Sequence, residues 1–176
     1  RELLQLWRDK TGRLTAALVA AGAIAISSLR RGGILIGTHI SALAGIPDRA
    51  FGDLEADLEQ LNDQIFPVLD ENAALRMQER IRAAAREGDS VGGILETAVT
   101  GLPAGIGEPW FDTVESLLAH ALFGIPAVKG VEFGEGFGFA AMTGSRANDG
   151  LFVRDGKIAM RTNHNAGING RITNGM

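Results

Sequence analysis

Residues 14–43, LTAALVAAGAIAISSLRRGGILIGTHISAL, contain the first clear transition from helix to strand in the chain. The run from Leu14 to Ile26 is rich in alanine and apolar on nearly all sides, which is typical of a buried helix. We expect this helix over about residues 15–29, ending at the glycine pair 32–33. In residues 34–43, every second side chain falls on the same face, as in a half-buried strand. One face carries Ile34, Ile36, Thr38 and Ile40.

Two further helices are expected directly downstream. Asp53 and Asp70 stand where N-caps belong, Pro67 ends the first helix, and Gly88 closes the second. The helical spacing predicts these inward-facing side chains: Leu54, Leu58, Leu61 and Ile65 in the first helix, and Ala74, Met77, Ile81, Ala84 and Ala85 in the second.

The rest of the chain continues to mix strands, loops and a helix. Asp112 and Glu115 are spaced as a capping box in front of another helix. Strand patterns are expected over residues 90–99, 127–133 and 137–142, and loops over 101–107 and 144–150. The order of elements lacks a regular βαβ rhythm, so it favours an α+β fold of packed layers over a doubly wound sheet.

Composition excludes several classes of protein. The 17 basic and 21 acidic residues give a net charge of −4, which argues against a general nucleic-acid binder. The absence of cysteine excludes disulfides and thiolate chemistry, and suggests a reducing compartment. Glycine occurs 24 times, about twice its usual share. Because apolar residues are interleaved with these glycines, we expect turns and close backbone approach to a ligand, not flexible linkers.

Membrane and metal partners are not expected. The longest apolar run holds about a dozen residues, and about 20 are needed to span a bilayer. His39, His120 and His164 are far apart in sequence and have no acidic partner at a metal-ligand spacing. His39 is interpreted as a packed, hydrogen-bonded structural histidine, whereas His164 has a ligand-facing position in a glycine- and asparagine-rich loop.

Two features are candidates for ligand binding. Arg13 follows Thr11 and Gly12 where the first helix is expected to begin, and helix amides with a guanidinium form an anion site; the alternative is an ordinary exposed arginine. Residues 162–175, TNHNAGINGRITNG, allow close backbone approach to a flat or anionic ligand; the alternative is a hairpin with a glycine turn. This stretch, which we call the Gly/Asn loop, is neither a P-loop nor a Gly-x-Gly-x-x-Gly motif.

Several segments together resemble the chorismate synthase family. They occur in the family's order and cover most of the chain from about Thr11 to Met176. The segments are residues 11–16 (TGRLTA), 19–25 (VAAGAIA), 33–40 (GILIGTHI), 88–93 (GDSVGG), 101–109 (GLPAGIGEP), 125–134 (IPAVKGVEFG) and the Gly/Asn loop. We therefore expect residues 1–10 to be a divergent N-terminal segment and residues 11–176 a partial chorismate synthase domain.

The resemblance implies a function and a fold. Members of the family are cytoplasmic lyases that convert 5-enolpyruvylshikimate 3-phosphate to chorismate by 1,4-elimination of phosphate. They need reduced FMN and are usually homotetramers. The implied fold is a β-α-β sandwich, with helices packed between antiparallel sheets. By matching motifs, Arg13 is expected to bind substrate phosphate or carboxylate, and Thr11, Pro126, Ala127 and Gly170 are expected to bind the flavin.

The sequence also departs from the family pattern. Arg171 stands where the family has the second glycine of a pair, Ala166 replaces another glycine, and Pro126 replaces an asparagine. A side chain at a position that needs positive φ strains the backbone. The motifs that carry the family's catalytic histidines and aspartate do not occur in these residues, so no catalytic residue is assigned and no turnover is expected from the chain alone. Two alternatives are a non-catalytic core module that binds no flavin and a generic phosphate- or nucleotide-binding protein.

Overall fold

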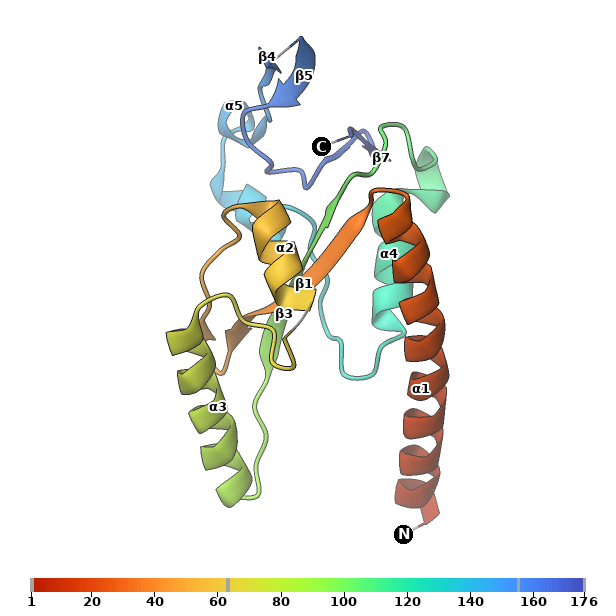
Figure 1. Cartoon of the computed structure of the whole chain (residues 1–176), viewed down its shortest axis with the longest axis vertical. Helices are drawn as coiled ribbons and strands as arrows, with labels where there is room; N and C mark the ends of the chain where they lie inside the picture. Colours follow the sequence, from red (N-terminus) through yellow and green to blue (C-terminus); the bar gives the residue numbers. More distant parts are fainter. Residues whose placement is uncertain (1, 63, 155, 176) are drawn as a thin grey trace. The chain divides into compact units, whose positions relative to one another are not determined.

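The computed structural model describes residues 2–62, 64–154 and 156–175, and side chains over 15–62, 64–153, 156 and 158–175. The chain divides into two compact units. Val19–Thr100 forms what we call the sheet unit, and Arg1–Leu18 with Gly101–Met176 forms the loop unit. The first helix, α1 (Glu2–Arg31), contributes residues to both (Figure 1).

The sheet unit is built on three antiparallel strands in the order β2-β1-β3 (Figure 1). These strands are β1 (Leu35–Leu43), β2 (Ile46–Pro47) and β3 (Gly93–Thr100). Ala44 and Gly45 join β1 to β2 with φ of 50° and 79°, as a tight two-residue hairpin turn requires. The register of β1 and β3 places His39 opposite Glu96. The strands predicted over 34–43 and 90–99 are confirmed, with ends that differ by a few residues.

Two capped helices complete the sheet unit, namely α2 (Leu54–Asn62) and α3 (Glu71–Arg86). Asp53 Oδ1 accepts a hydrogen bond from the backbone N–H of Ala56 at 3.2 Å, and Asp70 Oδ1 accepts one from Asn72 at 2.9 Å. Past the end of α3, Gly88 has a φ of +71°. Three of the four predicted helix-end residues, Asp53, Asp70 and Gly88, are therefore confirmed, because side-chain capping and left-handed glycine are local properties of the sequence. The prediction that Pro67 ends the first helix is wrong, because α2 ends at Asn62, five residues before it.

The core of the sheet unit lies where α3 packs on the sheet. Its buried residues are Val68, Ala73 and Met77, with Ile40, Leu43, Ile46, Phe66 and Ala74 partly buried around them. On α2, Leu58 is fully buried, and a Cβ added to Gly37 would lie 2.5 Å from Leu58 Cδ2. Glycine at position 37 therefore lets α2 approach β1 closely.

The predicted core is confirmed in part. Leu58, Leu61, Met77 and Ala84 are buried as predicted. Ile65 is fully exposed because α2 ends at Asn62, three residues before it. The prediction is likewise wrong for three other side chains, which are exposed: Leu54, Ile81 and Ala85.

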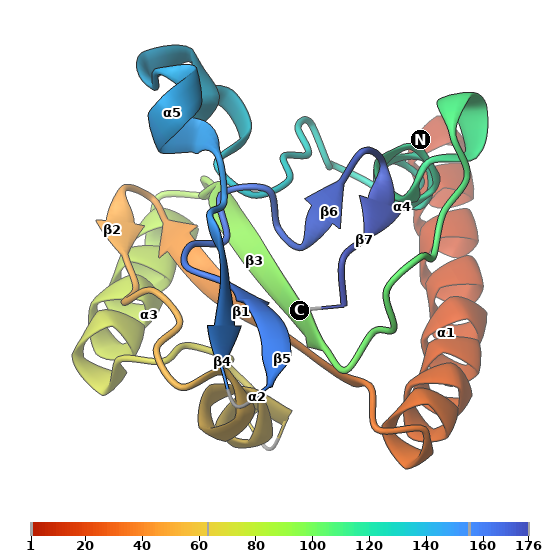
Figure 2. The ribbon, with the colours of Figure 1, turned by 90° about the horizontal axis from the view of Figure 1, so that it is seen from above.

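The loop unit contains one longer helix and several short elements. They are η1 (Trp110–Asp112), α4 (Val114–Phe123), η2 (Gly136–Ala141), α5 (Gly144–Ala147), the hairpin β4 (Leu151–Arg154) and β5 (Lys157–Met160), and the hairpin β6 (Ile168–Asn169) and β7 (Ile172–Thr173). Figure 2 shows the β6–β7 hairpin beside the start of α4, where the N–H of Val114 lies 3.5 Å from the carbonyl oxygen of Arg171. The α+β fold class is thus confirmed.

Four predictions in the loop unit are wrong. The loop expected over residues 144–150 begins with the short helix α5. The cap of α4 is Thr113, whose Oγ1 accepts a hydrogen bond from Ser116 at 3.1 Å, because Asp112 belongs to η1. Residues 137–142 lie almost wholly in η2, where Gly136 has a φ of +50° that breaks a strand. Residues 127–133 pair with no strand among the described residues, and a β-strand needs a partner for its backbone groups.

The first helix differs from its prediction in length and in burial. It begins at Glu2, so the chain is already helical at Thr11 and no helix N-terminus lies beside Arg13. The argument for an anion site from free helix amides at that point is therefore wrong. Leu18, Val19 and Ile24 are 66–73% exposed, so the prediction of a buried helix is also wrong. An apolar surface favours burial, but burial also needs elements that cover it. None of the described helices is long and apolar enough to cross a membrane.

Candidate functional site

The predicted binding residues all belong to the loop unit. Thr11 and Arg13 lie in the part of α1 whose side chains fall outside the described residues. Pro126 and Ala127 follow α4, and Gly170 lies in the turn between β6 and β7. One compact unit therefore carries every position that was predicted to bind flavin or substrate.

Pro126 and Ala127 form the centre of a tight turn. The N–H of Val128 donates to the carbonyl of Ile125 at 3.3 Å, and Ala127 has a φ of +70°. This is the pattern of a type II β-turn, which favours proline at the second position and glycine at the third. Alanine at the third position strains the backbone, and Pro126 and Ala127 are both exposed.

Gly170 and Arg171 form the two-residue turn of the β6–β7 hairpin. Their φ angles are +59° and +75°, which correspond to a type I′ turn. A Cβ added to Gly170 would meet no heavy atom within 4 Å, so the backbone there faces open space. The hairpin interpretation of the Gly/Asn loop is thus confirmed, and close approach of a ligand to Gly170 remains sterically possible.

Arg171 turns its side chain toward η1. Its Nη1 donates to the carbonyl oxygen of Trp110 at 3.2 Å, and Pro109, Trp110 and Arg171 line a hollow of about 240 Å³. Ala166 also has a positive φ of +51°. Both departures from the family's glycines therefore keep a backbone conformation that suits glycine.

Asp149 anchors the beginning of the Gly/Asn loop and was not singled out by its sequence. This residue is only 6% exposed. Its Oδ1 accepts from Thr162 Oγ1 at 2.6 Å and from the N–H of His164 at 2.8 Å, and its Oδ2 accepts from the N–H of Asn165 at 3.0 Å and from Asn165 Nδ2 at 2.8 Å. Burial opposes ionisation of Asp149, but these hydrogen bonds outweigh it and lower the pKa to about 2.

Thr173 anchors the other end of the loop. Its Oγ1 donates to the carbonyl of Pro103 at 2.7 Å and accepts from the N–H of Ile106 at 2.9 Å. Two backbone hydrogen bonds join the same segments, from Gly105 to Thr173 at 2.8 Å and from Thr173 to Ile106 at 2.9 Å. The hairpin is thereby fixed to the loop over residues 101–107.

Glycines permit two more close contacts. A Cβ on Gly107 would lie 2.8 Å from the carbonyl oxygen of Arg171, and a Cβ on Gly134 would overlap the carbonyl oxygen of His164. Glu135 N–H donates to that same His164 oxygen at 2.8 Å. Two of the segments that carry the family resemblance, 101–109 and 125–134, thus both pack on a third, the Gly/Asn loop.

Two further side-chain hydrogen bonds lie within the loop itself. Asn163 Oδ1 accepts from the N–H of Gly167 at 2.7 Å, and Asn174 Nδ2 donates to Asn169 Oδ1 at 2.7 Å. The His164 ring is 21% exposed, and its Nδ1 lies 3.3 Å from Asp149 Oδ1. The asparagines therefore build the shape of the loop, while Gly170 offers an unobstructed backbone.

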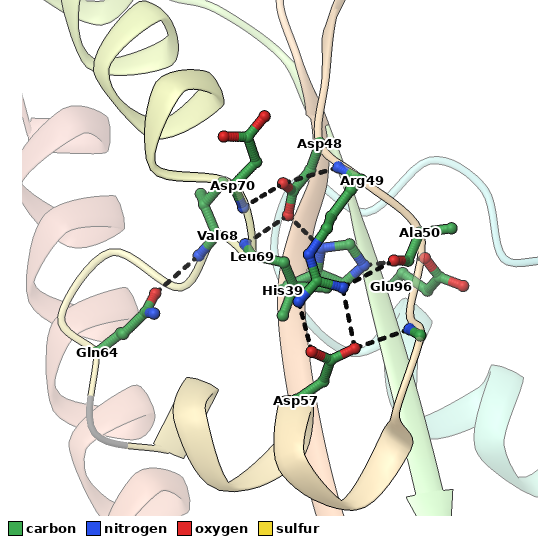
Figure 3. A network of polar contacts seen from close by, with 11 residues as sticks. His39, Asp48, Arg49, Ala50, Asp57, Gln64, Val68, Leu69, Asp70 and Glu96 are labelled. Atoms are coloured by element: carbon green, nitrogen blue, oxygen red, sulfur yellow. Dashed lines mark hydrogen bonds and ion pairs between the residues drawn. The ribbon is translucent and has the colours of Figure 1, made fainter.

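A second polar network lies in the sheet unit and surrounds His39 (Figure 3). The ring is fully buried, with Nδ1 2.7 Å from Asp48 Oδ2 and Nε2 2.9 Å from Glu96 Oε2. Phe51 packs against the ring edge to face at 4.6 Å. The interpretation of His39 as a packed, hydrogen-bonded structural residue is confirmed.

Asp48 connects this histidine to the segment before α3 (Figure 3). Its carboxylate accepts from the backbone N–H groups of Leu69, Asp70 and Arg49 at 2.7, 2.9 and 2.8 Å. Burial opposes ionisation, but these N–H groups and His39 hold the pKa of Asp48 below its ordinary value. The Asp48 carboxylate therefore ties β1 to the turn that starts α3.

Arg49 and Asp57 extend the network onto α2 (Figure 3). Arg49 Nη1 donates to Asp57 Oδ2 at 3.0 Å, and the N–H of Gly52 donates to the same oxygen at 2.8 Å. The hydrogen bond from Arg49, followed by that from Gly52, lowers the pKa of Asp57 to about 2. Among the described residues no group of three His, Cys, Asp or Glu side chains is arranged to hold a metal ion. The contacts of the network join β1, the segment before α3, and α2 through the buried side chains of His39, Asp48 and Asp57.

Comparison with known proteins supports the resemblance. The chorismate synthase family model matches residues 6–176. Chorismate synthase of Thermococcus gammatolerans is 45% identical over 170 residues, which is 94% of this chain and 46% of that protein. Chorismate synthase of Korarchaeum cryptofilum is 44% identical over 168 residues, again 94% of this chain and 45% of that protein.

A solved structure agrees with the family model and with these relatives. The crystal structure of a chorismate synthase superposes with a TM-score of 0.82 at 29% identity, over 92% of this chain and 52% of that one. The chain spans about half the length of the curated relatives it matches. With a family match over nearly all of its residues and the same fold, the chain belongs to the chorismate synthase family.

Proposed function

We propose that this chain forms the flavin- and substrate-facing part of a chorismate synthase, a lyase that removes phosphate and a proton from 5-enolpyruvylshikimate 3-phosphate to give chorismate. Membership of the family supports the reaction. The placement of all five carried-over positions in the loop unit supports the site. The proposed cofactor is reduced FMN, which when bound supplies electron density to the breaking C–O bond.

The exposed turns of the loop unit fit a flat ring system. Gly170 has no Cβ and faces open space, and Ala127 presents a small side chain in an exposed turn. Small residues at both positions let a ligand contact the backbone directly. We assign Gly170, Pro126, Ala127 and Thr11 to flavin contact because they match the family's motifs. Gly170 lies by the start of α4, and Pro126 and Ala127 follow its end.

Arg13 is the proposed substrate residue. A guanidinium forms paired hydrogen bonds to phosphate or carboxylate and carries its charge at every physiological pH. In an elimination that releases phosphate, such a cation stabilises the leaving anion. The chain supplies no assigned general acid or base, so the proposed role of its residues is binding and orientation.

Titration with reduced FMN under anaerobic conditions tests this proposal. We expect saturable binding by calorimetry and a change in the flavin absorption spectrum. Gly170→Ala should weaken binding by about tenfold, since a methyl group would stand between backbone and ring, equivalent to ~1.4 kcal/mol. Gly156→Ala is the matched control, because Gly156 has a φ of +75° and open space but lies in the β4–β5 turn.

The outcomes separate three functions. Binding that is sensitive to Gly170→Ala and insensitive to Gly156→Ala supports the flavin site. No flavin binding at all favours a non-catalytic core module of the family. Binding of phosphate or nucleotides without flavin favours a generic anion-binding protein. Addition of substrate should give no chorismate absorbance from this chain alone, and measurable turnover would contradict that expectation.

We also propose that the protein works as a homo-oligomer, a tetramer as implied by the family, in the cytoplasm. Exposed apolar side chains on α1 and α4 support association, because large exposed apolar patches mark interaction surfaces. Leu18, Ile24 and Phe123 are 73%, 73% and 55% exposed. Analytical ultracentrifugation checks the state, and a clean monomer at micromolar concentration would argue against it.

A further inference from the structure

The beginning of the Gly/Asn loop is held by one buried carboxylate. All four hydrogen bonds that Asp149 accepts come from Thr162, His164 and Asn165, which lie 13 to 16 residues further along the chain. Three of the four donors are backbone or side-chain N–H groups at the start of the loop. The Asp149 side chain is almost inaccessible to water, so solvent cannot replace a bond that is lost.

The loop between its two anchors is strained. Ala166, Gly167, Gly170 and Arg171 all have φ between +51° and +75°. For the two residues with a side chain this conformation costs on the order of 1 kcal/mol each. A loop of this kind relaxes toward ordinary φ values unless both ends are fixed, and Asp149 and Thr173 are the buried side chains that fix them.

We propose that Asp149 is a positioning residue, whose buried carboxylate holds the Gly/Asn loop in the shape that presents the Gly170 backbone to the flavin. This inference rests on the flavin site proposed above. Asp149 does not touch the ligand in this scheme and acts through the loop. Since the carboxylate is ionised at any pH well above 2, its hold on the loop is constant across physiological pH.

Asp149→Asn is the test because it keeps the shape of the side chain. A carboxamide has one acceptor oxygen, so two of the four hydrogen bonds are lost and an NH₂ group faces two donors. Thr162→Ala removes a single hydrogen bond and should have a smaller effect. Asp112→Asn is the control, since it removes one negative charge from an exposed position of the same unit.

We expect Asp149→Asn to weaken binding of reduced FMN by at least about tenfold, equivalent to ~1.4 kcal/mol. Thr162→Ala should fall between Asp149→Asn and wild type, and Asp112→Asn should match wild type. At saturating flavin, the absorption spectrum of the Asp149→Asn complex should differ from that of wild type. A variant that merely unfolds more easily would show the wild-type spectrum at saturation. Amide hydrogen exchange at His164, Asn165 and Gly167 should become faster.

Two results overturn the inference, and they differ from failure of the proposed function. If wild type binds flavin and Asp149→Asn binds it with equal affinity and an identical spectrum, Asp149 does not position the site. If the loop amides exchange at the wild-type rate in Asp149→Asn, the carboxylate does not hold the loop. If wild type itself binds no reduced FMN, the proposed function fails first and the positioning role fails with it.

Discussion

Gly134→Ala tests the packing of the Gly/Asn loop at its tightest point. A Cβ at this position would overlap the carbonyl oxygen of His164 and lie 3.0 Å from the backbone nitrogen of Ala166. Both neighbours are backbone atoms, so neither can rotate out of the way. The loop has to move outward, and that movement breaks the hydrogen bond from the N–H of Glu135 to His164.

The expected loss of stability has three sources. Alanine at a φ of +59° costs about 1 kcal/mol relative to glycine. Loss of the Glu135 hydrogen bond costs about 1 kcal/mol. Displacement of packed backbone costs about 1–3 kcal/mol, as overpacking does elsewhere. We therefore expect the free energy of unfolding of the loop unit to fall by about 3–5 kcal/mol.

The assay is urea denaturation followed by tryptophan fluorescence. Trp7 and Trp110 are the two tryptophans of the chain, and both belong to the loop unit, so the signal follows that unit. Gly156→Ala is the matched control, because it has the same left-handed strain but no neighbour within 4 Å. It should cost only about 1 kcal/mol.

The difference between the two variants decides the question. A gap of about 2 kcal/mol or more attributes the loss to the contact between Gly134 and the loop. If Gly134→Ala is no less stable than Gly156→Ala, that contact does not exist in solution and the packing of residues 125–134 on the Gly/Asn loop is wrong. Gly134→Ala should also weaken binding of reduced FMN, because the displaced loop carries Gly170.

Three other predictions concern charge and strain. His39→Phe keeps a ring but removes the two nitrogens that contact Asp48 and Glu96, and should reduce the stability of the sheet unit by about 2–4 kcal/mol in urea denaturation followed by far-UV circular dichroism; an unchanged midpoint would contradict the network. Asp57 and Asp149 have pKa values of about 2 in the folded chain against an ordinary 3.8, so each contributes stability above about pH 4 that is lost as pH falls toward 2. Each shift corresponds to on the order of 2 kcal/mol. In Asp57→Asn, the fall in the free energy of unfolding between about pH 4 and pH 2 should therefore be smaller than in wild type. Arg171→Gly should raise the melting temperature, since glycine relieves strain at a φ of +75° worth about 1 kcal/mol; a fall would show that the bond to Trp110 outweighs it.

Local chemistry made much of the sheet unit predictable. Asp53, Asp70 and Gly88 mark helix ends through bonds and backbone angles that involve only their near neighbours. The alternating side chains over residues 34–43 predict a strand because a strand with one buried face shows this two-residue period. The burial of His39 was also foreseeable, because small and apolar residues surround it in sequence.

The loop unit was harder to predict because its order comes from distant contacts. Thr173 bonds to Pro103 across 70 residues, and Asp149 bonds to partners 13 to 16 residues away. Neither pairing leaves a periodic signal in the sequence. Residues 137–142 carry an apolar pattern suited to a strand, yet Gly136 at positive φ starts a turn of 3₁₀ helix there. The segments that resemble the family were the better guide to this unit.

Two residues that stand where the family has glycine indicate that the backbone of the loop unit is strongly constrained. Ala166 and Arg171 keep positive φ although each carries a side chain that disfavours it, and Ala127 does the same in the turn after α4. Strain of this kind persists only where the surrounding structure fixes the backbone, and it is found preferentially at binding sites. Asp149, Thr173 and the close approach at Gly134 supply that constraint. The contacts around residues 166–171 therefore fix the backbone there. An arginine in place of glycine at position 171 keeps the same backbone conformation and lowers the stability of the unit instead.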